Sequence, residues 1–269
     1  MTTTLPARIT AHLPAIDRAV AEAVADLGAG LTAISPALAP VDPVLGPAVA
    51  LELVHTCALV HDDVLDNTDA RRGVPSVHTA FAARHGEGWA GTAAAYGRAA
   101  AILLGDVALA AADGQLRTAA VPPAALDRAH AAFTRLRIEV MAGQFLDVDA
   151  AARGHDGRER ALRVATLKSA RYSVGRPLEL GALLAGTDDA VASRMLAVGD
   201  PIGRAFQLRD DLLGVFGDPA VTGKPAGSDL AEGKRTLLVA EALQRLDAAG
   251  RAELEAGLGD RELDAARAG

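Results

Sequence analysis

The stretch His61-Asp62-Asp63-Val64-Leu65-Asp66 ends a long apolar run, residues 48–60. A second cluster, Arg209-Asp210-Asp211-Leu212-Leu213-Gly214, follows the apolar residues 202–208 in the same way. Carboxylates in apolar surroundings are costly unless a counter-charge balances them, because buried charges lose their hydration. On a helix with 3.6 residues per turn, Asp62 and Asp66 share one face and Asp63 is turned aside. These clusters predict a hard divalent cation bound between carboxylates.

The composition indicates a helical protein with a full core. The chain has 269 residues, of which 50% are hydrophobic and only 3% aromatic, so helices must pack largely through alanine and leucine. We expect one domain over residues 1–269, since single domains reach this size. The single cysteine, Cys57, excludes a disulfide framework and indicates a reducing compartment.

Net charge and hydropathy restrict the kinds of binding partner and the location that we expect. A net charge of −7 with no basic run argues against nucleic acid. No uninterrupted span of about 20 apolar residues and no signal sequence is apparent, so we expect a cytoplasmic protein.

Helical periodicity extends almost throughout, and no alternating strand pattern appears. The fold class expected is therefore all-α. Pro177 and Pro201 fall inside helical patterns and are expected to kink or break them. The expected helices cover about 5–27, 43–67, 91–113, 123–151, 158–185, 190–216 and 234–247.

Cations follow both aspartate clusters. Arg71-Arg72-Gly73 comes five residues after Asp66, and the loop Thr222-Gly-Lys-Pro-Ala-Gly227 follows the second cluster. Lys168 stands alone on an apolar helix. Carboxylates that bind magnesium, combined with Arg and Lys, suit a diphosphate, because the metal bridges carboxylate and phosphate oxygens while the cations neutralise the remaining charge.

The ordered set of motifs resembles the trans-isoprenyl diphosphate synthases, the polyprenyl synthetase family that includes geranylgeranyl diphosphate synthases. The resemblance is strongest over residues 48–239. It implies an isoprenoid-synthase-type helical bundle around a deep apolar cavity, with the two aspartate helices facing each other at its mouth. Between the aspartate motifs, the similar short signatures are Gly105-Asp106, Gly143-Gln144 and Lys168-Ser169.

The resemblance also implies the roles of individual residues. Asp62 and Asp66 would bind two magnesium ions and Asp210 a third, with Asp63 and Asp211 in supporting positions. The allylic diphosphate would be held by Arg71, Lys168 and Lys224, and Arg72 would face the second substrate, isopentenyl diphosphate. Further substrate contacts would come from Gln144, Phe206 and Gln207.

The expected product length depends on the size of the side chains on the helix that leads to Asp62. One turn deeper lie Cys57 and Ala58, which are small, so a prenyl tail would not meet a bulky floor there. We expect a geranylgeranyl-sized product or substrate; the alternative is that a neighbouring helix, near Phe133, Phe145 or Leu103, supplies the floor.

Three departures from the family keep other functions open. The family's basic Gly-Gly-Lys-Arg-x-Arg-Pro signature corresponds here to residues 28–40, which contain no Lys or Arg. The second motif ends in Gly214 instead of aspartate, and the family's further C-terminal helices would lie beyond Gly269. A terpene cyclase, or a prenyltransferase with another acceptor, would need only one diphosphate site. A catalytically silent partner subunit is the third reading, and the family is typically a homodimer.

Overall fold

The computed structural model describes residues 42–71, 73–154, 157–218 and 226–260. The expected helix at 5–27, the stretch at 28–40, Arg72 and Lys224 lie outside these residues. The chain divides into two compact units, Met1–Pro122 and Pro123–Gly269. Each unit is helical throughout its described part, apart from loops and one very short hairpin, as the all-α prediction requires.

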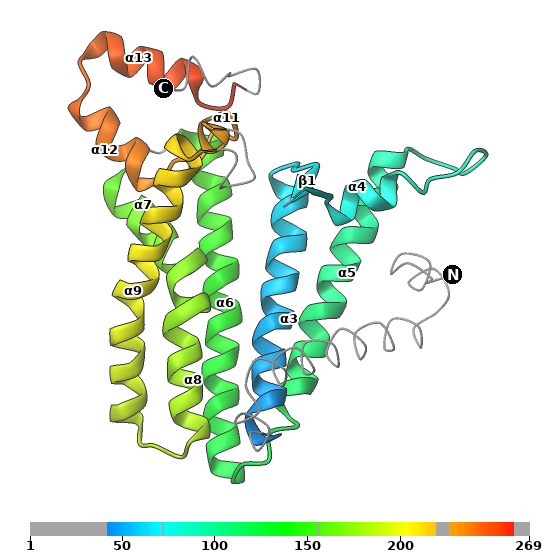
Figure 1. Ribbon diagram of the computed structural model, residues 1–269, viewed down its shortest axis with the longest axis vertical. Helices are drawn as coiled ribbons and strands as arrows, with labels where there is room; N and C mark the ends of the chain where they lie inside the picture. Colours follow the sequence, from blue (N-terminus) through cyan, green and yellow to red (C-terminus); the bar gives the residue numbers. More distant parts are fainter. Residues whose placement is uncertain (1–41, 72, 155–156, 219–225, 261–269) are drawn as a thin grey trace. The chain divides into compact units, whose positions relative to one another are not determined.

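The first unit pairs two long helices. Helix α3 (Asp42–Leu65) packs along α5 (Ala93–Leu116), and the short α4 (Val77–Ala82) packs on α5 (Figure 1). Buried residues recur every three or four positions on both helices, from Val49 to Val60 on α3 and from Ala101 to Leu116 on α5. Many of them are alanines, which accounts for close packing in a chain with few aromatic residues.

A two-residue hairpin follows α3. Strands β1 (Ala70–Arg71) and β2 (Val74–Pro75) pair antiparallel, with Arg71 opposite Val74. Gly73 in the turn has a φ of +77°, a conformation that glycine adopts without strain. The sequence did not predict this hairpin or α4. The hairpin places the Arg71 side chain back toward the end of α3.

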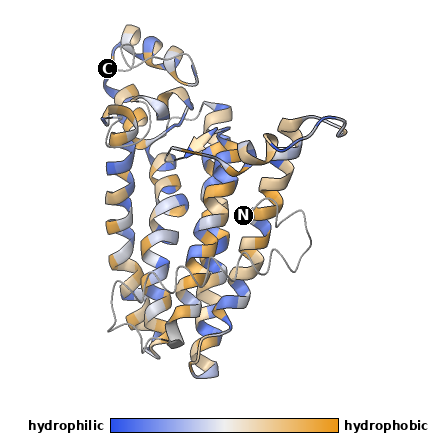
Figure 2. Ribbon diagram, turned by 45° about the vertical axis from the view of Figure 1, so that its right-hand side comes forward, coloured by the Kyte–Doolittle hydropathy of each residue, from blue (hydrophilic) through white to orange (hydrophobic). Residues whose placement is uncertain are grey.

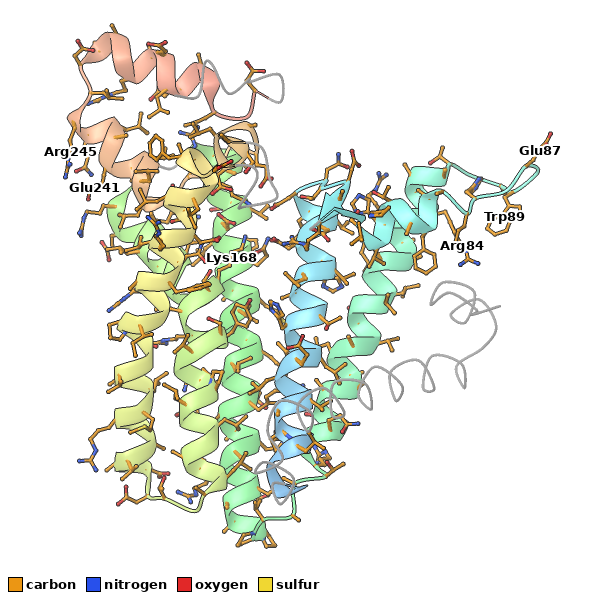
Figure 3. All side chains as sticks on the ribbon, in the orientation of Figure 1. Arg84, Glu87, Trp89, Lys168, Glu241 and Arg245 are labelled. Carbon is orange, nitrogen blue, oxygen red and sulfur yellow. The ribbon has the colours of Figure 1, made fainter. Side chains whose placement is uncertain are left out.

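The loop between α4 and α5 is held by aromatic rings. The ring centroid of Trp89 lies 5.4 Å from that of Tyr96 and 5.6 Å from that of His85. Figure 3 shows Trp89 near the tip of this loop, with Arg84 and Glu87 beside it.

Helix α5 is long and apolar enough to cross a membrane by length and composition, the one such helix among the described residues. Core helices of soluble proteins pass the same test; α5 packs on α3 and α4, and 28% of its most apolar stretch is buried. Figure 2 shows α5 mostly in hydrophobic colours, whereas α9 of the second unit carries hydrophobic and hydrophilic residues along its length.

The second unit is a layer of long helices. Helix α6 (Pro123–Arg153) and α9 (Asp189–Phe216) both pack on a central rod made of the π-helix η2 (Ala165–Gly175) and α8 (Arg176–Leu184) (Figure 1). The short α7 (Arg158–Val164) leads into η2. A buried ionic network ties the rod to its neighbours, because Arg176 donates to both Glu139 on α6 and Glu179 on α8.

Three shorter helices complete the described part of this unit. They are α11 (Ser228–Ala231), α12 (Leu237–Arg245) and α13 (Ala248–Gly257). Val215 at the end of α9 joins Leu230, Val239 and Leu243 in one buried cluster, so α11 and α12 are anchored on α9. An ion pair between Arg158 and Glu241, with donor and acceptor 2.8 Å apart, joins α7 to α12.

The helix expected over 158–185 is present as an uninterrupted helical run over residues 158–184, whose middle is the π-helix η2. Pro177 lies in the first turn of α8, directly after η2, and does not break the run. Pro201 lies within the continuous helix α9, so the break expected at this residue does not occur. Two glycines bring the neighbouring helices against η2. A Cβ at Gly143 would lie 2.2 Å from the backbone nitrogen of Lys168, and one at Gly203 would lie 2.6 Å from Cα of Ala170.

Candidate active site

The first aspartate motif forms the last turn of α3. Asp62 and Asp66 lie one turn apart, as the bond from the Asp66 backbone N–H to the Asp62 carbonyl shows. Asp63 is buried, with 4% of its surface exposed, and its Oδ1 accepts hydrogen bonds from Nε and Nη2 of Arg71 at 2.9 and 2.7 Å. Arg71 Nη2 also lies 3.7 Å from Oδ2 of Asp62. Asp63 therefore has a different position from the other two carboxylates, and it fixes the arginine.

Electrostatics keep Arg71 charged in this position. Burial alone would lower the pKa of Arg71, but its hydrogen bond to Asp63 and the charges of Asp63, Asp62 and Asp66 outweigh burial and raise that pKa. Arg71 is therefore a counter-charge for the buried Asp63, a role for which the sequence predicted only a divalent cation.

The Gly105-Asp106 signature receives a structural role. A Cβ at Gly105 would lie 2.2 Å from Nε2 of His61, so glycine is needed to admit the imidazole. His61 Nε2 lies 2.9 Å from the carbonyl oxygen of Ile102, which can only accept a hydrogen bond, and 3.8 Å from Oδ1 of Asp106. His61 thus links α3 to α5, and its Nδ1 lies 3.7 Å from Cys57 Sγ.

Cys57 is buried in the first unit, whereas its neighbour Ala58 is half-buried. Burial raises the pKa of the Cys57 thiol to about 11, with a further contribution from the charge of Asp106. The thiol is therefore protonated at neutral pH and is not a nucleophile.

The second aspartate motif lies near the end of α9. Asp210 is exposed, whereas Asp211 is buried and accepts a hydrogen bond from Nε2 of Gln207 at 2.7 Å. Burial raises the pKa of Asp211 to about 6; the charges of Asp229 and Asp210 raise it as well, and the bond from Gln207 and the charge of Lys234 oppose them. The exposed member of the pair is thus Asp210, the residue expected to bind metal.

Position 214 ends this motif, and its glycine is matched by a carboxylate from α11. Asp229 is buried, and its Oδ2 would lie 2.1 Å from a Cβ at Gly214. Lys234 Nζ lies 3.8 Å from Oδ1 of Asp229 and 2.5 Å from Glu232. Sequence reasoning missed Asp229, because nothing in its local sequence indicates that it packs against α9.

Lys168 lies on the π-helix η2, in the upper part of the second unit in Figure 3. Its Nζ donates to Oδ2 of Asp147 on α6 at 2.6 Å, an acidic partner that the sequence did not predict. Gln144 lies on α6, as Asp147 does, and its Nε2 is buried without a hydrogen-bond partner in the part of the chain that the structure describes. Phe206 on α9 is 68% exposed. An unmatched buried donor beside a paired lysine is consistent with a polar ligand in this region.

The residues present suit magnesium better than a softer metal. All five expected ligands are aspartates, and carboxylate oxygens are what magnesium prefers. In the described ranges no three His, Cys, Asp or Glu side chains are grouped to hold a metal ion. Magnesium commonly binds through one or two carboxylates together with waters and substrate phosphates, so pairs of aspartates suffice.

A family model described as polyprenyl synthetase matches residues 20–268, nearly the whole chain and both compact units. The chain belongs to the polyprenyl synthetase family. A geranylgeranyl pyrophosphate synthase of Geoglobus acetivorans is 35% identical over 197 residues, which are 73% of this chain and 56% of that protein. A (2E,6E)-farnesyl diphosphate synthase of Mycobacterium tuberculosis is 39% identical over 204 residues, which are 76% of this chain and 52% of that one.

Solved polyprenyl synthetases share the fold. A geranylgeranyl pyrophosphate synthase from Corynebacterium glutamicum, complexed with isoprenyl diphosphate and magnesium, matches with a TM-score of 0.77 and 44% identity over 81% of this chain and 62% of that one. The chain therefore spans less than two thirds of the length of these relatives.

Proposed function

We propose that residues 1–269 form a single isoprenoid synthase-like domain that acts as a magnesium-dependent prenyltransferase. It would join an allylic diphosphate to isopentenyl diphosphate and release a longer trans-polyprenyl diphosphate of about geranylgeranyl size. The observation that carries this proposal is the pair of aspartate motifs, in each of which one carboxylate, Asp63 or Asp211, is buried and hydrogen-bonded to a neighbouring side chain, in a chain matched to the family over residues 20–268.

In this proposal Asp62 and Asp66 hold two magnesium ions and Asp210 holds a third, while Asp63 and Asp211 support them. The bound ions would neutralise the diphosphate oxygens and so make inorganic diphosphate a better leaving group. Asp63 contributes through Arg71, whose guanidinium it fixes. Asp211 contributes through its place beside Gln207 and Asp210.

The cations of the chain would bind the allylic diphosphate directly. Arg71, Lys168 and Lys224 donate charged hydrogen bonds to its oxygens, which strengthen as negative charge develops on the leaving group. Gln144 Nε2 supplies a neutral donor, and Phe206 and Gln207 complete the contacts on α9. Arg72 would face the isopentenyl diphosphate.

In the proposed reaction, bond breaking, bond formation and proton loss follow one another in that order. The allylic C–O bond breaks, and the double bond of isopentenyl diphosphate attacks the allylic cation to form a C–C bond. A proton then leaves the new cation, with the released diphosphate as its acceptor. Holding both reactants beside one another supplies the proximity contribution to the rate.

The growing tail would run past Cys57 and Ala58. Their small side chains leave room for at least three isoprene units, which motivates the geranylgeranyl assignment. We also propose a cytoplasmic homodimer that binds no nucleic acid.

Chain elongation is supported over cyclisation by the relatives, whose names are geranylgeranyl, farnesyl and geranylfarnesyl diphosphate synthases. The test is to incubate purified protein and magnesium with each allylic diphosphate, with and without isopentenyl diphosphate. A product longer by five carbons only when both substrates are present supports the proposal. A hydrocarbon or alcohol formed from the allylic substrate alone would favour a cyclase.

A further inference from the structure

The ammonium of Lys168 is held by a carboxylate on α6, three residues after the Gly143-Gln144 signature. Nζ of Lys168 lies 2.6 Å from Oδ2 of Asp147, and the two side chains are 20% and 17% exposed. A pair this short and this shielded from water is less screened than a surface ion pair. We propose that Asp147 is a positioning residue, which orients Lys168 toward the leaving diphosphate. The inference rests on the proposed role of Lys168 in binding that group.

The backbone geometry brings the two residues together. Gly143 on α6 lies against the backbone of Lys168, since a Cβ there would be 2.2 Å from the Lys168 nitrogen. Asp147 lies four residues after Gly143 and therefore on the same face of α6. The close approach of the two backbones at Gly143 thus presents Asp147 to the lysine that projects from η2.

The neighbouring residue Gln144 supports a ligand at this place. Its buried Nε2 has no hydrogen-bond partner among the residues that the structure describes. A buried donor without a partner costs free energy, and a phosphate oxygen would satisfy it. Gln144 precedes Asp147 by three positions, about one helical turn.

An aspartate partner does not block phosphate binding by the lysine. An ammonium carries three N–H donors, so Lys168 can donate to Asp147 and also to a phosphate oxygen. The lysine stem is flexible, and a fixed acceptor limits the directions in which the charge can point. Asp147 itself repels an anionic substrate, so its benefit should appear in the step that develops charge on the leaving group and not in substrate binding.

The test is a kinetic comparison of Asp147→Asn with the wild type. Asp147→Asn keeps the shape of the side chain and removes its charge. We expect kcat to fall by about ten- to a hundredfold, the range that a misplacement of about an ångström costs. The allylic KM should change by less than about threefold, because lost repulsion offsets lost orientation. Asp147→Glu should recover part of kcat.

Two comparisons separate positioning from a structural role. Asp149→Asn removes a carboxylate two residues along α6, where Arg153 and Arg160 are the partners, and should leave kcat unchanged. In a Lys168→Met background Asp147→Asn should have no further effect, since residues that act as a unit are not additive. An equal loss in both backgrounds, or a wild-type kcat for Asp147→Asn, would overturn the proposal.

A measurement without turnover separates this inference from the proposed function. Brief labelling with an amine-reactive ester, read by mass spectrometry, should modify Lys168 faster in Asp147→Asn than in the wild type or Asp149→Asn. Unchanged labelling would overturn the pairing itself. A wild-type protein that forms no product would contradict the proposed function and leave the labelling result to decide the pairing.

Discussion

A Cβ atom on Gly214 would lie 2.1 Å from Oδ2 of Asp229, so the Asp229 carboxylate fills the space beside α9 that a side chain at position 214 would need. The aspartate that often ends the second motif therefore does not fit here with Asp229 in place. Glycine at position 214 and the buried Asp229 therefore belong to the same packing contact between α9 and α11.

Gly214→Asp should lower the free energy of unfolding by at least about 2 kcal/mol, because it overpacks the contact and sets two carboxylates against each other. Chemical denaturation measures this. Adding Asp229→Gly to Gly214→Asp should restore part of the loss. Gly181→Ala on α8 is the control, since a Cβ there meets nothing within 4 Å and should be neutral or stabilising. Wild-type stability for Gly214→Asp would show that Asp229 moves aside freely.

Both aspartate motifs should be needed for turnover. Asp62→Asn or Asp210→Asn should lower kcat by at least about a hundredfold, the scale on which lost electrostatic stabilisation is felt. Without metal, the stability of Asp210→Asn should stay the same or rise, because its repulsion with Asp211 disappears. Asp113→Asn, which removes an exposed pair with Arg117, should leave kcat unchanged. Full activity in EDTA would refute the metal's role.

The buried network around Glu139 should stabilise the second unit in a pH-dependent way. Burial raises the pKa of Glu139, but its hydrogen bonds and charge interactions with Arg176 and Arg171 outweigh burial and lower that pKa below its ordinary 4.5. The stabilisation is therefore complete above the pKa of the unfolded chain and is lost as pH falls through the lower folded value.

Glu139→Gln should cost about 2 to 4 kcal/mol at pH 7, somewhat below the range for fully buried pairs, because it leaves Arg176 without its main counter-charge. The difference from wild type should shrink below about pH 4. Glu241→Gln, which breaks the more exposed contacts of Glu241 with Arg158 and Arg245, should cost less than about 1 kcal/mol at any pH (Figure 3). A pH-independent loss in Glu139→Gln would indicate packing and not charge. Unfolding curves at several pH values provide the measurement.

Chain length should respond to Ala58. Ala58→Phe adds a ring on α3 and should shift products toward shorter chains, with a loss of about 1 to 3 kcal/mol in stability. Ala99→Phe, at an exposed position on α5, should leave the product distribution unchanged. Product analysis by chromatography decides between them. An unaltered distribution in a folded Ala58→Phe variant would place the tail along a different wall.

Helical periodicity predicted the long helices well, because their cores are built from alanine and leucine at three- and four-residue spacing. It did not predict the π-helix η2, against which Gly143 and Gly203 bring other helices into close contact. The need for a counter-charge predicted a divalent cation at the first aspartate cluster; the pairing of Arg71 with Asp63 was not predicted. The contacts of Lys168 with Asp147 and of Gly214 with Asp229 were not predicted either, because each joins positions whose proximity only the tertiary structure creates.

Incorporation of isopentenyl diphosphate tests the central claim most directly. The protein is incubated with magnesium, geranyl or farnesyl diphosphate and isotopically labelled isopentenyl diphosphate, and the products are separated by length. The proposed prenyltransferase predicts labelled diphosphates that are five carbons longer than the allylic substrate or longer still, and their loss in Asp62→Asn. Release of inorganic diphosphate from the allylic substrate alone, with every product unlabelled, would contradict chain elongation.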